Sequence, residues 1–430
     1  MPWSLLSVSR TRVSRFSRSG LALLTAACSW TSVQATNGYS PTGFGTINKG
    51  MVGAGVALPQ DAMAAATNPA GMGLVGHRID VGAALFSPSD RGYTANDDGV
   101  YIEPGKFTSE NDLFLIPHFG WNKPLSEQST LGISIGGNGG MNTEYENAVF
   151  GNFGPSTAPT GVDFAQLFLG VTYAHEISPG HWLGVMPIAA VQRFKAEGLE
   201  AFEAFSTSPD NVSNNDYDMS WGYGIRFGWL GKISDRLSLA ASYQSRLNMS
   251  EFEDYEGLFA EQGDFDTPSS WVVGLAYTAT PDITLVLDYQ RINYGDVKSL
   301  SNANDLDIRN PDYHLGADEG LGFGWDDMDI IKLGVQWEYN PKWTFRAGYS
   351  HASELFEGTQ ALFNILAPAT IRDHISLGST YSYSDTNRVN LSLTRALEEE
   401  IKGTSVFTGS QTGSVEMEQW ELEVSWTHLF

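Results

Sequence analysis

The chain has 430 residues, of which 42% are hydrophobic, and it carries 25 basic against 50 acidic side chains, a net charge of −25. We expect no nucleic-acid partner for so negative a chain, because contacts with phosphates need lysine and arginine. Its single cysteine excludes an internal disulfide and a thiolate metal site, and its length suits one large barrel or two ordinary domains.

Residues 1–35 have the composition of a secretory signal peptide. Four arginines, at positions 10, 12, 15 and 18, precede an apolar run from Leu21 to Cys28, and small residues before and at Ala35 form a cleavage site. We therefore expect cleavage near Ala35. The remaining chain keeps 21 of the 25 basic residues and all 50 acidic ones, a net charge of −29, and it has no cysteine.

Residues 36–76 are rich in glycine and alanine and contain few large apolar side chains. Small residues let a backbone pack closely against its surroundings, but this segment cannot build a core of its own. It needs walls from the rest of the chain. We therefore expect residues 36–76 to form a plug, called the hatch below, inside a structure built from residues 77–430.

Alternation of apolar and polar residues, which indicates β-strands, recurs from residue 79 to the C-terminus. In one segment Trp221, Tyr223, Ile225, Phe227 and Trp229 alternate with glycine, serine and arginine. Fourteen strands are predicted, near 79–94, 108–122, 130–143, 162–177, 182–196, 218–233, 237–252, 268–280, 283–295, 328–340, 342–353, 371–384, 387–402 and 415–430.

The connections between these strands alternate between short turns and long loops. The short turns are 123–127, 178–180, 234–236, 281–282, 341 and 385–386. Short turns on one side, long loops on the other and an even strand number describe a bacterial outer-membrane barrel, and the last strand ends on the aromatic Phe430. The sequence thus predicts an all-β fold, a 14-stranded antiparallel transmembrane β-barrel plugged by the hatch; the alternative is a soluble secreted all-β protein.

Three long loops, 197–217, 253–267 and 354–370, carry apolar side chains that a solvated loop would not favour. In the first two loops these side chains recur at the spacing of short helices with one apolar face. Exposed apolar surface commonly marks an interaction site, although the same residues could pack together and cover the barrel mouth. The candidate ligand-binding residues are Phe202 and Phe205 of the first loop, Phe252 directly before the second loop, and Leu258 and Phe259 within it.

The third predicted strand contains Gly136, Gly137, Asn138, Gly139 and Gly140. Glycines inside a strand weaken the ladder of hydrogen bonds and mark bulges or kinks. A kink would open a gap in the wall through which a hydrophobic solute could leave sideways into the membrane. The alternative is a close fit of this strand against the hatch.

Two charged features are candidates for binding. Arg193 and Lys195 lie at the outer end of the fifth strand, where either could meet a carboxylate or pair with one of the many acidic residues of the chain. Residues 296–329 hold nine acidic residues against two basic ones, which suits either divalent cations at the lipopolysaccharide surface or a plainly solvated loop. No metal-ligand spacing is present.

For catalysis the sequence offers little. His374 shares a strand face with Arg372 and Ser376, but nothing marks a nucleophile, and there is no glycine-rich phosphate loop. We expect neither an enzyme nor a cofactor.

Two segments carry a family resemblance. The hatch, with Lys49 to Ala57, Asp61-Ala62 and Asn68 to Met72, and the segment Asn364 to Pro368 resemble the outer-membrane transporters of long-chain fatty acids and aromatic hydrocarbons. The resemblance implies that a hydrophobic substrate first lands between loops 197–217 and 253–267 and then moves to a site beside the hatch.

The resemblance also implies the later steps. A change around Asn68, Pro69 and Ala70 opens the route, and the kinked third strand releases the substrate laterally. Arg193, within Gln192 to Lys195, resembles a basic position that the family uses for a fatty acid carboxylate.

We therefore expect passive, ligand-gated uptake of long-chain fatty acids across the outer membrane of a Gram-negative cell. The alternatives are uptake of aromatic hydrocarbons or alkanes by the same route, a polar porin, and an enzyme at the rim. The expected partners are these hydrophobic molecules, outer-membrane lipid and lipopolysaccharide, and the expected working unit is a monomer.

Overall fold

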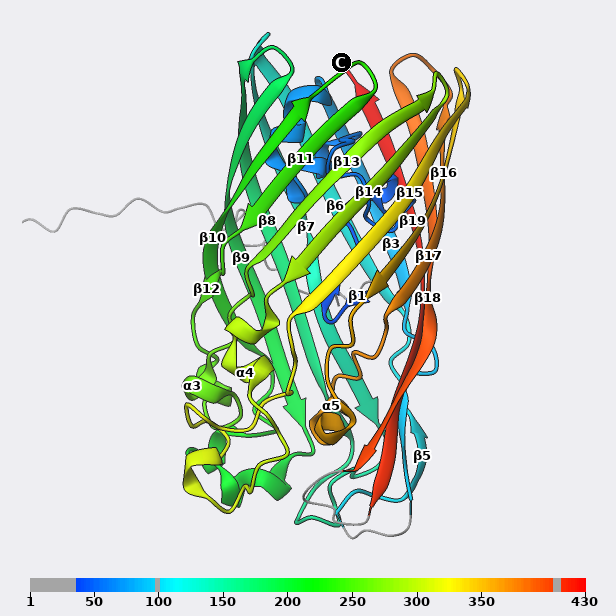
Figure 1. Cartoon of the computed structure of the whole chain (residues 1–430). Coiled ribbons are helices and arrows are strands. Elements are labelled where there is room, and N and C mark those ends of the chain that lie inside the picture. Colours follow the sequence, from blue (N-terminus) through cyan, green and yellow to red (C-terminus); the bar gives the residue numbers. More distant parts are fainter. Residues whose placement is uncertain (1–35, 97–100, 405–410) are drawn as a thin grey trace, which may run out of the picture.

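The computed structural model describes residues 36–96, 101–404 and 411–430. The predicted signal peptide, residues 1–35, lies outside the described residues. The fourteen predicted wall strands are confirmed as a closed antiparallel barrel (Figure 1). Their bounds are β3 (Arg78–Ser87), β4 (Gly92–Ala95), β5 (Gly105–Thr108), β6 (Phe114–Ser126), β7 (Ser129–Tyr145), β8 (Thr160–Ser178), β9 (His181–Glu197), β10 (Asp218–Lys232), β11 (Leu237–Gln244), β12 (Asn248–Met249), β13 (Ser270–Thr280), β14 (Ile283–Ile292), β15 (Met328–Asn340), β16 (Trp343–Ala352), β17 (Asp373–Ser382), β18 (Asn387–Thr404) and β19 (Thr412–Leu429).

Three predicted strands are each divided in two, as β3 and β4, β5 and β6, and β11 and β12. The barrel closes where the last strand, β19, pairs with the first, β3, from Trp420 opposite Ser87 to Leu429 opposite Arg78. The predicted turn at 123–127 is shorter than expected, because β6 continues to Ser126 and pairs there with Ser129 of β7. The short turns and the C-terminus share one end of the barrel, and the long loops share the other (Figure 1).

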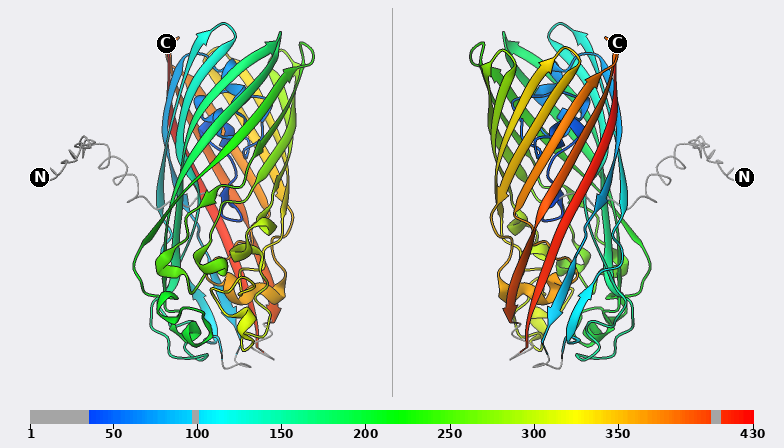
Figure 2. Two further views of the ribbon diagram at one scale, coloured as in Figure 1. Left: turned by 90° about the vertical axis from the view of Figure 1, so that its left-hand side faces the viewer. Right: turned by 90° about the vertical axis from the view of Figure 1, so that its right-hand side faces the viewer.

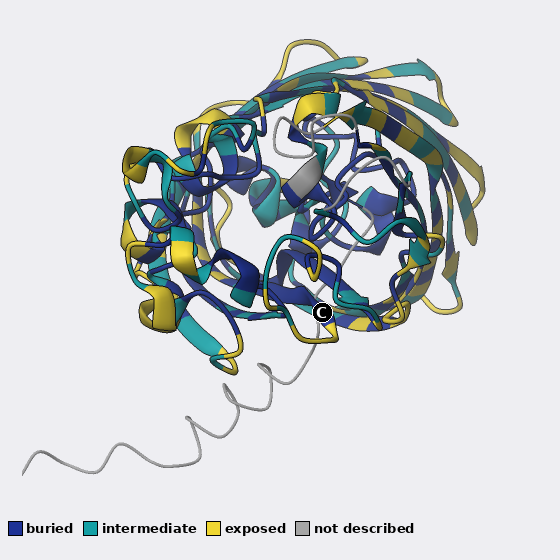
Figure 3. Ribbon diagram, turned by 90° about the horizontal axis from the view of Figure 1, so that it is seen from below, coloured by how far each residue is buried: buried dark blue, intermediate teal, exposed yellow. Residues whose placement is uncertain are grey.

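Buried and exposed residues alternate along the strands of the wall (Figure 3), as expected when side chains face the lumen and the lipid in turn. Along β19, Trp420, Leu422 and Val424 are exposed, whereas Glu421 and Glu423 between them are buried. An apolar outer face with aromatic residues and a polar inner face is the pattern of a transmembrane barrel. The lumen therefore holds charged groups that lipid would not accept.

The hatch lies inside the barrel, toward the end with the short turns (Figures 1 and 2). It comprises β1 (Thr36–Asn37), β2 (Ser40–Pro41), the helical turn α2 (Thr46–Lys49) and the 3-10 turns η1 (Ala62–Ala66) and η2 (Pro69–Leu74). Glycines of the wall make room for it: a Cβ at Gly348 would overlap the backbone of Met51, and one at Gly120 would overlap Ala62. The small inner faces of the strands thus fit a backbone that passes close by.

The long loops fold into short helical turns at the opposite end. They are η3 (Glu200–Phe205), η4 (Pro209–Asn211), η5 (Glu253–Tyr255), α3 (Ala260–Gly263), η6 (Tyr294–Asp296), α4 (Lys298–Ser301), η7 (Pro311–Tyr313), η8 (Gly358–Gln360) and α5 (Ala361–Asn364). The short helices predicted in loops 197–217 and 253–267 are therefore present. Within the described ranges, no helix is both long and apolar enough to cross a membrane.

Candidate functional site

The three predicted gating residues form the start of η2. Asn68 caps this turn, its side-chain oxygen accepting from the Ala70 N–H at 3.1 Å, and Pro69 occupies the first position, where its missing N–H costs nothing. The Asn68 amide also donates to the carbonyl of Val56 at 3.3 Å and to that of Trp229 in β10 at 3.1 Å. One side chain thus joins two parts of the hatch to the barrel wall.

Two wall glycines form the seat of this turn. A Cβ at Gly228 of β10 would overlap the Asn68 side chain and approach Pro69, and one at Gly184 of β9 would overlap the backbone at Ala70. With the turn in place, neither wall position has room for a side chain.

Buried charges hold the other side of the hatch. Lys49 contacts Glu421 at 2.8 Å and Glu423 at 2.7 Å, both on the lumen face of β19. Glu423 also lies 3.2 Å from His118 of β6. Burial by itself would lower the pKa of Lys49, but the two carboxylates outweigh it and raise that pKa. Lys49 is therefore held as a cation.

Two further carboxylates of the wall accept hydrogen bonds from the backbone of the hatch. Asp288 of β14 accepts from the N–H groups of Gly55 and Val56 at 2.7 and 2.9 Å. At η1, Asp61 caps the turn by accepting from Met63 at 3.0 Å, and Asp80 of β3 accepts from the Ala62 N–H at 2.8 Å. Burial, with the Asp80 carboxylate nearby, raises the pKa of Asp61 to about 7.

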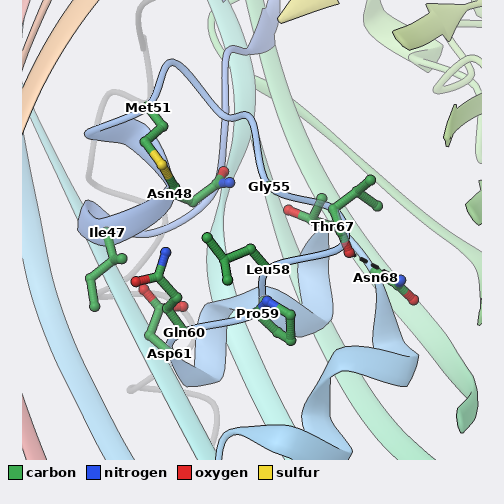
Figure 4. Close-up of a pocket in the computed structure, with 12 residues that line it drawn as sticks. Ile47, Asn48, Met51, Gly55, Leu58, Pro59, Gln60, Asp61, Thr67 and Asn68 are labelled. Carbon is green, nitrogen blue, oxygen red and sulfur yellow. Dashed lines mark hydrogen bonds between the residues drawn. The ribbon is translucent and has the colours of Figure 1, made fainter. Parts of the chain in front are cut away.

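A small cavity of about 20 Å³ lies within the hatch itself (Figure 4). Its lining comes from residues 47–68, including Ile47, Met51 and Leu58 on one part of the segment and Asp61 and Asn68 on another. None of these residues belongs to the aromatic cluster near the long loops.

A layer of aromatic rings lies between the hatch and the long loops. Phe259 of loop 253–267 packs on Phe194 of β9 at a centroid distance of 4.7 Å and on Phe265 at 4.8 Å. Phe265 continues to Phe164 of β8 at 5.0 Å, and Phe252 lies 5.7 Å from Phe194. The predicted residues of this loop thus converge on the barrel interior.

Loop 197–217 adds a second group of rings to the same buried cluster. Phe202 packs on Phe150 at 5.0 Å, on Phe153 at 5.1 Å and on Phe363 of α5 at 5.4 Å, and Phe205 lies 5.7 Å from Phe153. Leu258 and Phe205 are half-buried against the cluster. All five apolar candidates therefore belong to one packed layer of side chains.

Arg193 and Lys195 lie on the other face of β9 from Phe194. Phe194 points into the aromatic layer, whereas Arg193 contacts Asp163 of β8 at 3.3 Å and stacks over the ring of Tyr217 at 4.5 Å. Lys195 contacts Glu197 at 2.8 Å. The structure gives both residues partners within the chain and does not bring them into the layer, and their role toward a carboxylate stays a prediction.

The third strand of the wall, β7, contains the predicted irregularity. Its pairing with β8 shifts by one residue between Gly137 and Gly139, so Asn138 is the extra residue of a bulge. In the described residues, the ladder between β6 and β7 ends at His118 opposite Gly136. Beyond the gap, the backbone carbonyl of Glu144 in β7 accepts from the N–H of Glu110, which lies between β5 and β6, at 2.9 Å.

The close fit with the hatch is present as well. Gly139 has a φ of 146°, and a Cβ there would overlap the carbonyl of Tyr39. The gap in the ladder between β6 and β7 and the close contact between β7 and the hatch therefore lie on the same stretch of β7.

Tyr39 is the residue that the sequence did not single out. It is 1% exposed, and its ring contacts Phe164 and Tyr294, each at 5.6 Å, as well as Phe265 and Trp325, each at 6.2 Å. The sequence feature that could have identified it is a single aromatic residue near the start of a segment of small residues. The tip of the hatch is thus part of the aromatic layer.

The remaining candidates have structural partners. In segment 296–329, Asp327 and Asp329 pair with Arg291 at 2.8 and 2.9 Å, and the described residues hold no group of three or more acidic, histidine or cysteine side chains able to bind a metal. His374 is buried in the lumen, 3.5 Å from Ser350, and Ser376 accepts from the Val52 N–H of the hatch. Ser376 therefore anchors the hatch.

Comparison with known proteins agrees with this arrangement. Residues 22–425 match the family model "Outer membrane protein transport protein (OMPP1/FadL/TodX)". The chain is 22% identical over 433 residues to the long-chain fatty acid transport protein of Salmonella typhi, covering 90% of this chain and 93% of that protein, and 21% identical over 450 residues, with the same coverage, to the one of Escherichia coli strain K12.

Solved structures share the fold. The Pseudomonas putida toluene transporter TodX superposes with a TM-score of 0.68 at 16% identity, over 91% of this chain and 99% of that one. A Pseudomonas aeruginosa FadL homologue superposes with a TM-score of 0.66 at 15% identity, with the same coverage. The chain belongs to the OMPP1/FadL/TodX family of outer-membrane transport proteins, which are channels for hydrophobic compounds and not enzymes.

Proposed function

We propose that this channel takes up long-chain fatty acids passively, with the hatch as a gate that the substrate opens. The observation that carries the proposal is the continuous contact from the apolar loops, through Phe259 and Phe265, to Tyr39 of the hatch and from there to the bulge of β7. An apolar layer repels sugars and ions, because leaving water costs polar groups several kcal/mol, about 2 to 7 without a compensating hydrogen bond.

Access begins at the two apolar loops. The apolar side chains of the two loops form a surface that a hydrocarbon chain can enter, exchanging contacts between rings for contacts between a ring and the hydrocarbon. These side chains are Phe202 and Phe205 on one loop, and Phe252, Leu258 and Phe259 on the other. A chain that slides between these rings reaches Tyr39. Nothing in this step requires energy input, since packing between two rings is exchanged for similar packing between a ring and the hydrocarbon.

The gate is the part of the hatch between Tyr39 and Ala70. Tyr39 blocks the layer, and Asn68, Pro69 and Ala70 fix the hatch to Gly184 and Gly228 of the wall. When Tyr39 moves, the hatch also leaves β7, because the Tyr39 carbonyl accepts from the Gly140 N–H. Opening the layer and freeing the bulge are then one motion.

The exit is the stretch of β7 beyond Gly136, where the ladder to β6 ends. Leu113 and Leu115 of the adjoining stretch are exposed on the outside of the wall. A hydrophobic solute that passes here enters the bilayer without crossing the polar end of the barrel. We propose this as the lateral release route.

Aromatic hydrocarbons are the second candidate substrate. The observation in their favour is that the rings around Tyr39 are apolar, and the TodX structure that shares this fold is described as a toluene transporter. Fatty acids are preferred because the lumen also holds two buried cations beside the hatch, Arg226 and Lys332. An open polar porin is disfavoured by the hatch and the aromatic layer.

We further propose that one chain is the working unit, because the layer, the gate and the exit all lie within it, and that its outer face contacts lipid and lipopolysaccharide. Cleavage after Ala35 is supported by Thr36, which is buried in the lumen and donates its N–H to Gln419 at 2.9 Å.

The test is uptake of labelled oleate and labelled toluene by cells that lack their own transporter. Deleting Asn138 removes the extra residue of the bulge and should straighten β7, which closes the exit and lowers uptake to that of cells without the protein. Asn138→Ala is the matched control: it keeps the bulge and loses only the 2.7 Å hydrogen bond to Gln166, so uptake should persist.

Oleate uptake by the wild type identifies the fatty acid route, and toluene uptake alone selects the second candidate. Undiminished uptake by the deletion variant, inserted in normal amounts, would refute lateral release through β7.

A further inference from the structure

Residues 363–371, called the strap below, lie in the segment between β16 and β17. The strap begins within α5, at the end of the barrel that holds the long loops (Figure 1). All of its residues are buried, and Phe363, Ile365 and Leu366 belong to the same buried cluster as the aromatic layer. Segments that connect strands usually run over the surface, so a wholly buried one calls for an explanation.

The strap is bonded to β7, the strand that contains the bulge. The Thr143 hydroxyl donates to the carbonyl of Leu366 at 2.7 Å, and the Tyr145 hydroxyl donates to that of Ile365 at 2.9 Å. Thr143 and Tyr145 are 3% and 0% exposed, and they lie on the same face of β7 because they are two residues apart. Two side chains of β7 therefore hold two consecutive carbonyl groups of the strap.

A third hydroxyl holds the strap on its other side. Thr370 of the strap donates its hydroxyl to the carbonyl of Glu399 in β18 at 2.9 Å. In the order of the closed barrel, β19, β3, β4, β5 and β6 lie between β18 and β7. The strap therefore spans the sector of the wall that ends at the gap between β6 and β7.

β7 is consequently held from the lumen at two places. Near the bulge, Gly140 donates its N–H to the carbonyl of Tyr39 in the hatch at 3.2 Å. Farther along the strand, Thr143 and Tyr145 hold the strap. Both contacts fall on the stretch beyond Gly136, where the ladder to β6 has ended. The proposed exit is thus closed from the inside by two segments, the tip of the hatch and the strap.

Trp325 joins these two segments. Its ring packs on that of Tyr39 at a centroid distance of 6.2 Å, and its indole N–H donates to the side-chain oxygen of Asn364 in the strap at 2.7 Å. Trp325 is 1% exposed and Asn364 is 0% exposed. A buried donor left without its acceptor is costly, so a strap that moves away also disturbs the ring that packs on Tyr39.

We propose that the strap is a second gate of the lateral exit and that Trp325 couples it to the hatch. The inference rests on the proposed release through β7 and adds a regulatory element to that route. A solute that has displaced Tyr39 meets the strap on the same strand, and it reaches the gap only when the strap also leaves Thr143 and Tyr145. Two coupled gates keep the lumen closed toward the bilayer when one of them fluctuates alone.

The test is the labelling rate of a single cysteine placed between the two gates. Met141 is 6% exposed and lies on the same face of β7 as Thr143. Residues 36–430 contain no cysteine, so Met141→Cys in lipid vesicles reports opening of the exit through its reaction with a membrane-soluble maleimide. Tyr145→Phe removes one hydroxyl that holds the strap and keeps the ring. We expect this variant to be labelled about threefold faster or more.

Tyr255→Phe is the matched control. Tyr255 is likewise a wholly buried tyrosine of the same cluster, and its hydroxyl also donates to a backbone carbonyl, that of Asp216, at 2.7 Å. Within the described residues, its hydrogen bonds and ring contacts go to β9 and to loops 197–217 and 253–267. The variant deletes the same group without touching the strap, so labelling of Met141→Cys should keep its wild-type rate.

Trp325→Phe tests the coupling, because it keeps a ring in the aromatic layer and removes the N–H that binds Asn364. Amide hydrogen exchange of residues 36–41 and 363–371 is measured for Tyr145→Phe with and without this second change. Tyr145→Phe alone should accelerate exchange in both segments. In the Trp325→Phe background it should accelerate exchange in the strap only. An equal acceleration of residues 36–41 in the two backgrounds would overturn the coupling.

The outcomes separate this inference from the proposed function. Unaltered labelling in Tyr145→Phe, or equally faster labelling in Tyr145→Phe and Tyr255→Phe, overturns the second gate. Release through β7 would then stand with the hatch alone as its gate, provided that cells still take up oleate. The proposed function fails separately if the wild type takes up neither oleate nor toluene. The labelling rates require no substrate, so they would still decide whether the strap closes the gap.

Discussion

The backbone N–H of Gly140 donates to the carbonyl of Tyr39 at 3.2 Å. This bond joins the tip of the hatch to the bulged strand of the wall, at the place where that strand has no ladder to β6. Since the Tyr39 ring is also embedded in the aromatic layer, one residue touches both the access route and the exit. The following experiments test this coupling and the seating of the hatch.

Removing the Tyr39 ring should open the layer, whereas removing its hydroxyl should not. The hydroxyl has no hydrogen-bond partner among the described residues, so Tyr39→Phe keeps all of the ring packing. Tyr39→Ala removes the ring from the layer, a truncation that costs about 3 to 5 kcal/mol in a packed core. We expect ion conductance in planar bilayers to rise for Tyr39→Ala only. Equal conductance of the Ala variant and the wild type would contradict a gate at this residue.

Gly139→Ala should displace the tip of the hatch. The new Cβ would overlap the Tyr39 carbonyl, and the φ of 146° adds backbone strain of about 1 to 3 kcal/mol. Amide hydrogen exchange of residues 36–41 should accelerate by about tenfold or more. Gly105→Ala is the control: its φ is 139°, but its Cβ would approach only Phe107 of its own strand. If hydrogen exchange accelerated in both variants, backbone strain alone would explain the effect, and the contact with Tyr39 would not be responsible.

Gly228→Ala should lift the turn that begins at Asn68, because the added Cβ would overlap the Asn68 side chain. Residues 36–430 contain no cysteine, so a single Ala70→Cys reports on the seat through its rate of maleimide labelling. We expect faster labelling in the Gly228→Ala background. Gly224→Ala on the same strand, whose Cβ would meet the flexible side chain of Leu247, should leave the rate unchanged; unaltered labelling in both would refute the seat.

Low pH should stabilise the hatch near η1. Burial, followed by the Asp80 carboxylate, raises the pKa of Asp61 from its ordinary 3.8 to about 7 in the folded protein, against the opposing effect of Arg78. A pKa raised by folding means that the protonated form is favoured in the folded state. The stabilisation is therefore fully present below about pH 4 and is lost as the pH rises through about 7.

Hydrogen exchange of residues 61–66, corrected for the intrinsic pH dependence of exchange, measures this effect. Protection should fall by about tenfold or more between pH 5 and pH 8. Asp61→Asn should remove that dependence while keeping an acceptor for the Met63 N–H. A pH dependence of the same size in Asp61→Asn would assign it to another group.

Local pattern was sufficient for the wall. Each strand needs one lipid-facing and one lumen-facing side. Alternation of apolar and polar residues therefore predicts both that a strand is present and which of its sides faces the lipid. The interruptions at 88–91, 109–113 and 245–247 were missed; at 245–247 the alternation continues although the hydrogen-bond ladder does not. The small-residue segment and the apolar loops were likewise visible as changes in composition.

The aromatic candidates and the glycine-rich stretch of β7 could be named from the sequence, but their joint geometry could not. The signal for Phe252 and Phe259 was local, an apolar face on a polar loop. That they pack on Phe194, and that Arg193 next to it faces away toward Asp163 and Tyr217, depends on how loops fold back over the wall. A short similarity around Arg193 carries no information about that packing.

By itself the sequence determined a closed barrel with a small-residue segment inside it, because alternation and composition act residue by residue along one strand. Only the tertiary structure decided what meets inside. Arg226, Lys332 and Thr42 come from β10, β15 and the hatch, and Tyr39 reaches the bulge of β7 from a distant part of the chain. Such meetings depend on barrel closure and strand register, which bring together residues that have no relation in sequence.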